Sequence, residues 1–365
     1  MATDPWNPPP ERIAIFRALQ LGDMLCAVPA LRALRAHAPH ARITLVGLRW
    51  AQSFVDRFRG YLDDLLVFPG YPGYPEQEGT IPAFLDFLGA ARAKRFDLAI
   101  QLHGSGELTN RILKLLEAKS TVGFVSERPG ASGAARNRDA DPGIAVPWPG
   151  EANEIHRYTA LMEAIGVPLR GDHLELPLDW TDWELYQEVV SRHRLPEGHF
   201  VCIHPGARLL SRRWPLERFA AVGNVLARDG WQLVVTGSSA ESRVTAELVA
   251  RLPRGTHDLT GQTSLGSMAA LISRSALLVC NDTGVSHIAA AMNTPSVVVA
   301  SGSDVRRWRP LDAERHPVLW HDVPCRPCTF DACPVGHHCA LGVQADAVIA
   351  EARRLLSTRD IRHAA

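Results

Sequence analysis

Several short polar segments that follow apolar runs carry the side chains best suited to chemistry. One is Leu21-Gly22-Asp23-Met24, which comes after the apolar run Arg12–Arg17. The glycine permits a tight turn, and Asp23 would then stand at the start of the next helix. Its carboxylate could cap that helix, or it could act as a general base that removes a proton from a hydroxyl. The two roles are compatible.

The second segment, His204–Pro215, carries Arg212 and Arg213 between a predicted strand end and a predicted helix start. Backbone N–H groups and the helix dipole favour an anion at such a position. Guanidinium groups also bind phosphate oxygens in pairs. A solvated basic loop is the alternative reading. The position at a strand end favours a diphosphate.

The third segment, Asn281-Asp282-Thr283-Gly284, connects the apolar run Leu277–Cys280 to another predicted helix, which carries His287. The hydroxyl of Thr283 and the N–H groups of the helix start suit a phosphate, and Gly284 allows close backbone approach. The alternative is an N-capping turn followed by a core histidine.

A fourth polar segment leads to Glu241, after the predicted strand Gln232–Thr236. Its carboxylate could accept hydrogen bonds from ribose hydroxyls, or it could stabilise the start of its helix. Three such loops at strand ends in one half of the chain predict a site for a nucleotide diphosphate there.

Parallel strands are needed to bring these loops together. Short apolar runs alternate with helical periodicity along the chain, which is typical of parallel sheets covered by helices. The predicted strands are 12–17, 43–46, 65–68, 98–102, 122–125, 199–203, 232–236, 277–280 and 296–300. The predicted helices are 24–36, 110–116, 154–165, 183–192, 216–228, 241–252, 267–273, 285–292 and 345–356.

The order of these elements predicts an α/β protein with two doubly wound, Rossmann-like domains facing a central cleft. Proline, glycine and acidic residues mix between 168 and 198, so we place the domains at 1–175 and 176–365. Residues 126–151 lack periodicity and are predicted to form a long loop. The last helix is predicted to pack back across the domains.

Composition narrows the class of protein. The 365 residues are 46% hydrophobic and 21% charged, with 39 basic and 39 acidic side chains, so nucleic acid is not indicated as a partner. The first ten residues are polar and rich in proline, and no apolar run reaches the length of a membrane span. We therefore expect a cytoplasmic protein, with peripheral contact at the inner face of the membrane where an acceptor is lipid-linked.

Taken together, the first three segments resemble glycosyltransferase family 9, which contains the ADP-heptose:lipopolysaccharide heptosyltransferases. The resemblance lies in LGDMLCAVPALRAL (21–34), HPGAR and RRWP (204–215) and NDTGVSHIAAAMNTP (281–295). It implies a GT-B fold with an N-terminal acceptor domain and a C-terminal nucleotide-sugar domain. It also implies an inverting transfer that needs no cofactor, from a nucleotide-diphosphate sugar, as in heptose from an ADP-sugar. The acceptor would be a hydroxyl of a lipopolysaccharide core or another lipid-linked or oligosaccharide surface glycan.

The family pattern also implies roles for individual residues. Asp23 matches the proposed base, and an arginine stands where the family has a lysine before Trp-Pro, which keeps the charge and changes the geometry. The donor-binding residues implied in this way are Arg212, Arg213, Glu241, Asp282, Thr283, Gly284 and His287. A sugar-nucleotide epimerase and a non-catalytic nucleotide-sugar binding protein of the same architecture are the alternatives.

Four cysteines crowd the C-terminal part of the chain, with two histidines among them. The set is Cys325, Cys328, Cys333 and Cys339, with His337 and His338. This density favours a structural zinc or iron ion, although the spacing is not that of a standard zinc ribbon. Reduced thiols or a single disulfide are the alternatives. A catalytic thiol is the least favoured, because no base is evident nearby.

Overall fold

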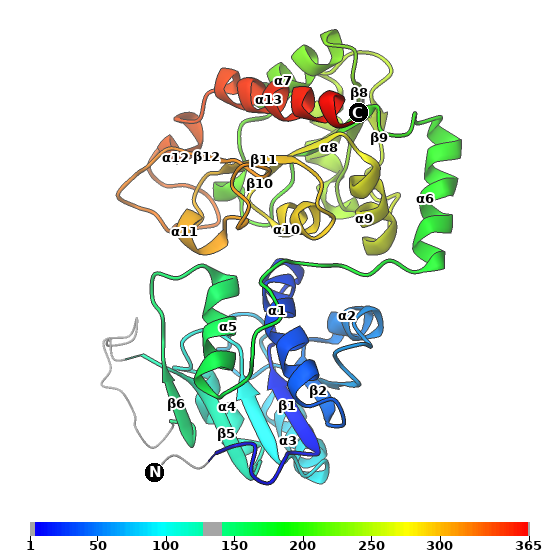
Figure 1. Cartoon of the computed structure of the whole chain (residues 1–365). Helices are drawn as coiled ribbons and strands as arrows, with labels where there is room; N and C mark the ends of the chain where they lie inside the picture. Colours follow the sequence, from blue (N-terminus) through cyan, green and yellow to red (C-terminus); the bar gives the residue numbers. More distant parts are fainter. Residues whose placement is uncertain (1–3, 127–140, 364–365) are drawn as a thin grey trace. The chain divides into compact units, whose positions relative to one another are not determined.

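The computed structural model describes residues 4–126 and 141–363, without the side chains of 359–363. Within this range the chain divides into two compact units, with the division after Asp172 (Figure 1). The boundary predicted from composition, between 175 and 176, falls just inside the second unit. Each unit is built around its own sheet.

The first unit contains a six-stranded parallel sheet in the order β3-β2-β1-β4-β5-β6. Its strands are β1 (Arg12–Phe16), β2 (Arg42–Gly47), β3 (Asp64–Val67), β4 (Leu98–Gln101), β5 (Ser120–Val125) and β6 (Ile144–Pro147). The central strands β1 and β4 are almost wholly buried, which explains why they read as continuous apolar runs rather than as an alternating pattern.

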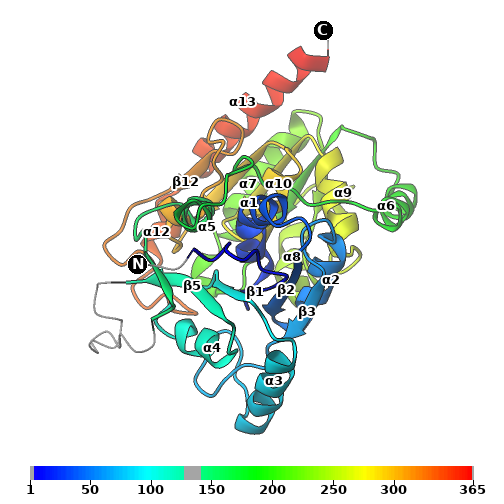
Figure 2. The same cartoon turned by 60° about the horizontal axis from the view of Figure 1, so that its bottom comes forward.

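Helices cover both faces of this sheet. Helices α1 (Leu21–His37) and α5 (Glu154–Ala164) pack together on one face. Helices α3 (Ile81–Ala93) and α4 (Thr109–Leu115) lie on the opposite face (Figure 2). They share a core with Ala14 and Phe16 of β1. The short helix α2 (Gln52–Arg57) follows a 3₁₀ turn after β2.

The second unit repeats the same topology, with the sheet order β12-β11-β10-β7-β8-β9. Its strands are β7 (Phe200–His204), β8 (Gln232–Val235), β9 (His257–Asp258), β10 (Leu277–Asn281), β11 (Ser296–Ala300) and β12 (Val318–Trp320). All of these pairings are parallel. The prediction of two doubly wound α/β domains is therefore confirmed.

The helices of the second unit also form two layers. One layer consists of α7 (Leu216–Arg228), α8 (Ser242–Val249) and α13 (Ala345–His363), and the other of α6 (Trp180–His193), α9 (Leu265–Arg274) and α10 (Gly284–Ala291). Helix α13 packs on α7 and on strands β10 and β11 (Figure 1). Val348 and Ala352 of this helix are fully buried in the core of the second unit.

Local sequence explains where α6 and α9 begin. Asp179 and Asp182 form a capping box, in which each carboxylate accepts the other residue's backbone N–H at 3.0 Å. Ser264 and Ser267 make the corresponding pair for α9. Such boxes satisfy two of the backbone donors that a helix start leaves open.

Several elements differ from the sequence prediction, and helix α2 and strands β9 and β12 were not predicted. Gly22 and Asp23 lie inside α1, which starts at Leu21, and do not form a turn before it. Helix α3 was not predicted, because its core-facing side is not separated from a polar side by a clear pattern. Strand β6 lies within the predicted loop 126–151, of which 127–140 lies outside the described residues.

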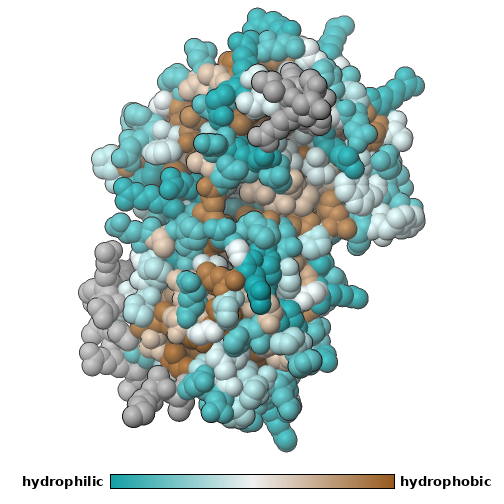
Figure 3. All heavy atoms as spheres, in the orientation of Figure 1, coloured by the Kyte–Doolittle hydropathy of each residue, from teal (hydrophilic) through white to brown (hydrophobic). Residues whose placement is uncertain are grey.

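Among the described residues, no helix has both the length and the apolar character that a membrane crossing requires. Figure 3 shows hydrophilic residues over most of the visible face, with hydrophobic residues in smaller areas between them.

Candidate active site

Each sheet has one point at which the strand order reverses. In the first unit it lies between β1 and β4, and in the second between β7 and β10. Ligands of open α/β sheets bind beyond the carboxyl ends of the strands at such points. Asp23 follows β1, Arg212 and Arg213 follow β7, and Thr283 follows β10. Asp23, the arginine pair and Thr283 therefore follow the strands that border these two points.

Asp23 is the third residue of α1 and does not cap it. The N-cap position belongs to Gln20, whose side chain makes no capping bond. The N-cap interpretation of Asp23 is therefore wrong, because the helix begins at Leu21, three residues earlier than predicted. In the first turn, the helix dipole still favours the ionised carboxylate. Its role as a base remains a prediction.

A buried arginine holds the backbone at Asp23 in place. The Arg17 side chain is 1% exposed, and its Nε donates to the Asp23 carbonyl oxygen at 3.1 Å. Another nitrogen of the guanidinium donates to the Leu102 carbonyl, just after β4. The same group lies 4.0 Å from a carboxylate oxygen of Glu154 and 4.2 Å from the ring centre of Tyr158. Arg17 thus ties together the loops that follow β1 and β4.

His103 makes a second tie between these loops. Its Nδ1 accepts the Ala18 N–H at 3.2 Å, so the ring proton belongs on Nε2, which lies 2.9 Å from the Tyr74 hydroxyl and 3.6 Å from Glu76 Oε1. Burial lowers the pKa of His103, and the neighbouring Glu76 opposes that shift. Neither His103 nor Arg17 was singled out from the sequence. The sequence signal that could have identified them is their position, because each is a polar residue at the end of a central apolar run.

In the second unit, Asn281 connects the loops that follow β7 and β10. This residue is fully buried, and its side-chain amide donates to the carbonyl oxygens of Pro205 at 2.7 Å and Gly206 at 3.3 Å. Its side-chain oxygen Oδ1 accepts the Trp214 N–H at 2.9 Å. One side chain therefore fixes both ends of the loop that carries the arginine pair.

Trp214 anchors the loop immediately after that pair. Its ring is 1% exposed and donates from Nε1 to the Val343 carbonyl at 3.0 Å. Arg213 donates from Nε to the Ala207 carbonyl at 2.9 Å, which leaves the rest of its guanidinium for other partners. Arg212 has a buried Nε with no hydrogen-bond partner among the described residues. A buried donor without a partner is costly, and a bound anion would satisfy it.

Thr283 presents a second unsatisfied group. It occupies the N-cap position of α10, yet its side chain makes no capping bond, and its buried Oγ1 lacks a partner within the described part of the chain. Gly284 is the first helical residue, so the open N–H groups of α10 lie next to this hydroxyl. The side chain of Thr283 therefore does not cap α10, in contrast to the N-capping alternative.

Glu241 stabilises its own helix start, as one of the two interpretations predicted. Its Oε2 accepts both the N–H and the hydroxyl of Ser238 at 2.8 Å. A methyl group on Gly206 would come within 1.9 Å of Glu241 Oε1, so only glycine allows this carboxylate to approach the loop after β7. A role toward ribose stays a prediction.

Asp282 directly precedes Thr283, and His287 follows it in α10. Both are largely buried, at 7% and 4% exposure. The Asp282 N–H donates to the Val299 carbonyl at 3.0 Å, and the ring centre of His287 lies 6.3 Å from that of Trp308. Their donor-binding roles are not tested by these contacts and remain predictions.

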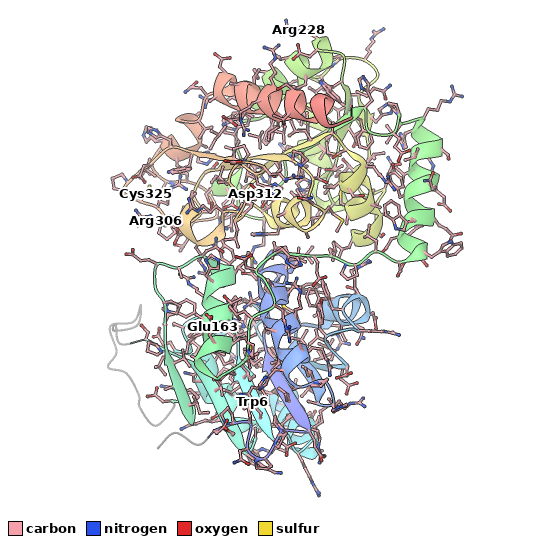
Figure 4. All side chains as sticks on the ribbon, viewed as in Figure 1. Trp6, Glu163, Arg228, Arg306, Asp312 and Cys325 are labelled. Carbon is pink, nitrogen blue, oxygen red and sulfur yellow. The ribbon has the colours of Figure 1, made fainter. Side chains whose placement is uncertain are left out.

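The four cysteines are all free thiols. Within the residues that the structure describes, no three His, Cys, Asp or Glu side chains are arranged to hold an ion. Cys325 is exposed at the outer side of the second unit (Figure 4), whereas Cys339 is buried. The sulfur of Cys333 accepts the His337 N–H at 3.1 Å. The arrangement of the described residues thus does not support the predicted zinc or iron.

Comparison with known proteins decides the family. Residues 86–338, more than half of the chain, match the model of glycosyltransferase family 9 (heptosyltransferase). The chain belongs to glycosyltransferase family 9. The resemblance seen in the three sequence segments is therefore confirmed, and the protein is a glycosyltransferase rather than an epimerase or a binding module. The matched range contains the loops that follow β7, β8 and β10 and begins after Asp23.

Individual relatives agree with this family. Lipopolysaccharide heptosyltransferase 2 of Salmonella typhimurium is 26% identical over 310 residues, which cover 79% of this chain and 82% of that protein. A family 9 glycosyltransferase from Veillonella parvula has a similar fold, with a TM-score of 0.76 at 23% identity over 98% of this chain and 99% of that one. The E. coli ADP-heptose heptosyltransferase II gives 0.71 at 20% identity over 96% and 99%. Both structures support the predicted GT-B fold.

Proposed function

We propose that this family 9 enzyme transfers heptose from ADP-heptose to a hydroxyl of a lipopolysaccharide core saccharide. The relatives named above support the sugar and the acceptor. The observation that carries the proposal is the pair of unsatisfied buried groups, Arg212 Nε and Thr283 Oγ1, on loops that follow the adjacent strands β7 and β10. A diphosphate supplies acceptor oxygens for both, beside the positive end of the α10 dipole.

The proposed reaction uses Asp23 as the base and the loops of the second unit to hold the leaving diphosphate. The Asp23 carboxylate takes the proton of the acceptor hydroxyl, whose oxygen forms a bond to the anomeric carbon of the sugar. The bond from that carbon to the diphosphate oxygen breaks on the opposite side, so the configuration inverts and ADP leaves with the electron pair. Arg212, Arg213 and the N–H groups of α10 stabilise the negative charge on the leaving diphosphate. In this proposal the fixed cations do what a divalent ion does in other transferases.

A transfer assay tests this function directly. Purified protein, ADP-heptose and a core saccharide that lacks the heptose should yield a product heavier by one heptose, and excess EDTA should leave the rate unchanged. NMR of the product should show the anomeric configuration opposite to that of the donor. The absence of transfer with this donor, alongside transfer from another nucleotide sugar, would contradict the heptose proposal.

Arg213 can be tested against a neighbour in the same loop. We expect Arg213→Met to raise the donor KM about 10- to 100-fold, the range that corresponds to losing a hydrogen bond to a charged group. The acceptor KM should stay near its wild-type value. Arg208→Met is the matched control, because Arg208 is exposed in the same loop. Equal effects of the two substitutions would show that only the net charge of the loop matters.

The place of action follows from the acceptor. We propose that the enzyme works in the cytoplasm at the inner face of the membrane, because a lipid-linked acceptor is anchored there. Co-sedimentation with vesicles that carry the acceptor, compared with plain vesicles, measures whether the contact depends on it.

A further inference from the structure

We infer that the cysteine-rich segment (residues 325–339) positions the arginine pair of the donor loop for the diphosphate. The inference rests on the proposed function, since it assigns a task to a part of the chain that the transfer reaction itself does not use. It concerns His337 above all, which we place as a positioning residue that acts through Ser211.

Ser211 directly precedes the arginine pair, and all of its polar groups bond to the cysteine-rich segment. Its N–H donates to the Asp331 carbonyl at 2.7 Å, and its hydroxyl donates to the Phe330 carbonyl at 2.6 Å. Its carbonyl oxygen accepts from His337 Nε2 at 2.8 Å. Ser211 is 1% exposed, so these partners replace water completely. The backbone that leads into Arg212 is therefore held from outside its own loop.

The His337 bond has a defined direction. A carbonyl oxygen only accepts, so His337 must carry a proton on Nε2 and donate it. The backbone of His337 is left-handed, with φ +57°, and it follows Gly336 at φ +86°. This turn aims the ring at the donor loop. The left-handed backbone also means that a replacement at 337 should tolerate positive φ, as asparagine does.

The segment has a second point of attachment that makes it a firm support. Cys328 N–H donates to the Gly302 carbonyl at 2.7 Å, in the loop that follows β11. A methyl group on Gly302 would come within 2.7 Å of Cys328 Cβ, so the two backbones are in close contact. Arg326 Nη1 donates to the Ser303 carbonyl at 2.6 Å in the same loop. The segment thus links the loops that follow β7 and β11.

These contacts come from main-chain groups, from His337 and from Arg326, and none needs a metal. The only sulfur among them is that of Cys333, which accepts the His337 N–H at 3.1 Å and so helps to fix the turn. Positioning of the arginine pair is therefore a task the segment can perform with its thiols free.

The test compares two neighbouring histidines by titrating the purified protein with ADP in a calorimeter. His337→Asn keeps the left-handed backbone and removes the bond to Ser211, and we expect the Kd for ADP to rise about three- to tenfold, as for the loss of one hydrogen bond. In the transfer assay, the donor KM should rise by a similar factor while the acceptor KM does not change. The control is His338→Asn, since His338 is exposed and an unchanged Kd is expected.

The outcomes separate this inference from the proposed function. If the wild-type protein does not bind ADP, the proposed donor is wrong and the inference falls with it. If the wild-type protein binds ADP and folded His337→Asn binds it equally well, the inference alone is overturned. Should His337→Asn not fold, Ser211→Ala decides, because it removes only the bond to Phe330. An ADP affinity equal to wild type in that variant overturns the inference, and a weaker one supports it.

Discussion

Asp23→Asn is expected to lower kcat by about 10²- to 10⁴-fold, the range in which positioned general bases contribute. Asparagine keeps the size of the side chain and its place in the first turn of α1, but it does not accept a proton at neutral pH. The backbone at this residue should stay in place, because Arg17 bonds to the carbonyl oxygen of Asp23, which the substitution keeps. The loss should therefore appear in the chemical step.

The measurement that distinguishes a base from a binding residue is the separation of kcat from donor affinity. We expect the Kd for ADP to stay within about twofold of wild type, since the proposed diphosphate site is built from residues of the second unit. Asp86→Asn is the control, because Asp86 is an exposed carboxylate on α3 of the same unit. Full transferase activity in Asp23→Asn would show that another group takes the proton.

The sequence predicted the central strands and the polar residues that follow them most reliably. The central strands are short and buried on both faces, so β7, β10 and β11 stand out as apolar runs, and the polar residues that follow them mark the ligand-binding edge. The same logic located Asp23, but it misjudged its position in the helix. Gly22 suggested a turn, whereas tertiary packing of α1 overrides the weak helix propensity of a single glycine.

The residues that hold the site loops in place could not be predicted from the sequence. Arg17 ends an apolar run, and the sequence gives no sign that its partners Glu154 and Tyr158 come from a distant helix. His103 and Asn281 likewise act through contacts with loops far away in the chain. Such ties depend on topology, because parallel strands bring distant loops to one edge. The spacing of the cysteine cluster suggested a metal, but it gave no sign that the main chain of this segment bonds to Ser211 and Gly302.

Arg17→Met is expected to destabilise the protein by about 3 kcal/mol, because it removes one member of a buried charged network. Methionine fills a similar volume, so the lost stability arises mainly because the fully buried Glu154 carboxylate loses one of its positive neighbours. Its other neighbour, Arg157, stays at 2.7 Å. The surviving partner places the effect at the lower end of what such substitutions cost. Chemical denaturation, monitored by circular dichroism, gives the free energy of unfolding for each variant.

Arg59→Met serves as the matched control for this measurement. Arg59 forms an ion pair with Asp56 at 3.0 Å, but its side chain is 77% exposed, so water replaces the partner and little change in stability is expected. The double variant Arg17→Met with Glu154→Gln sharpens the argument further. Because Glu154→Gln also removes the charged partner of Arg157, the double variant is compared with both single variants, and the deviation from additivity gives the coupling energy between Arg17 and Glu154. If this coupling energy is close to zero, the cost of Arg17→Met lies instead in the hydrogen bonds of Arg17 to the Asp23 and Leu102 carbonyls.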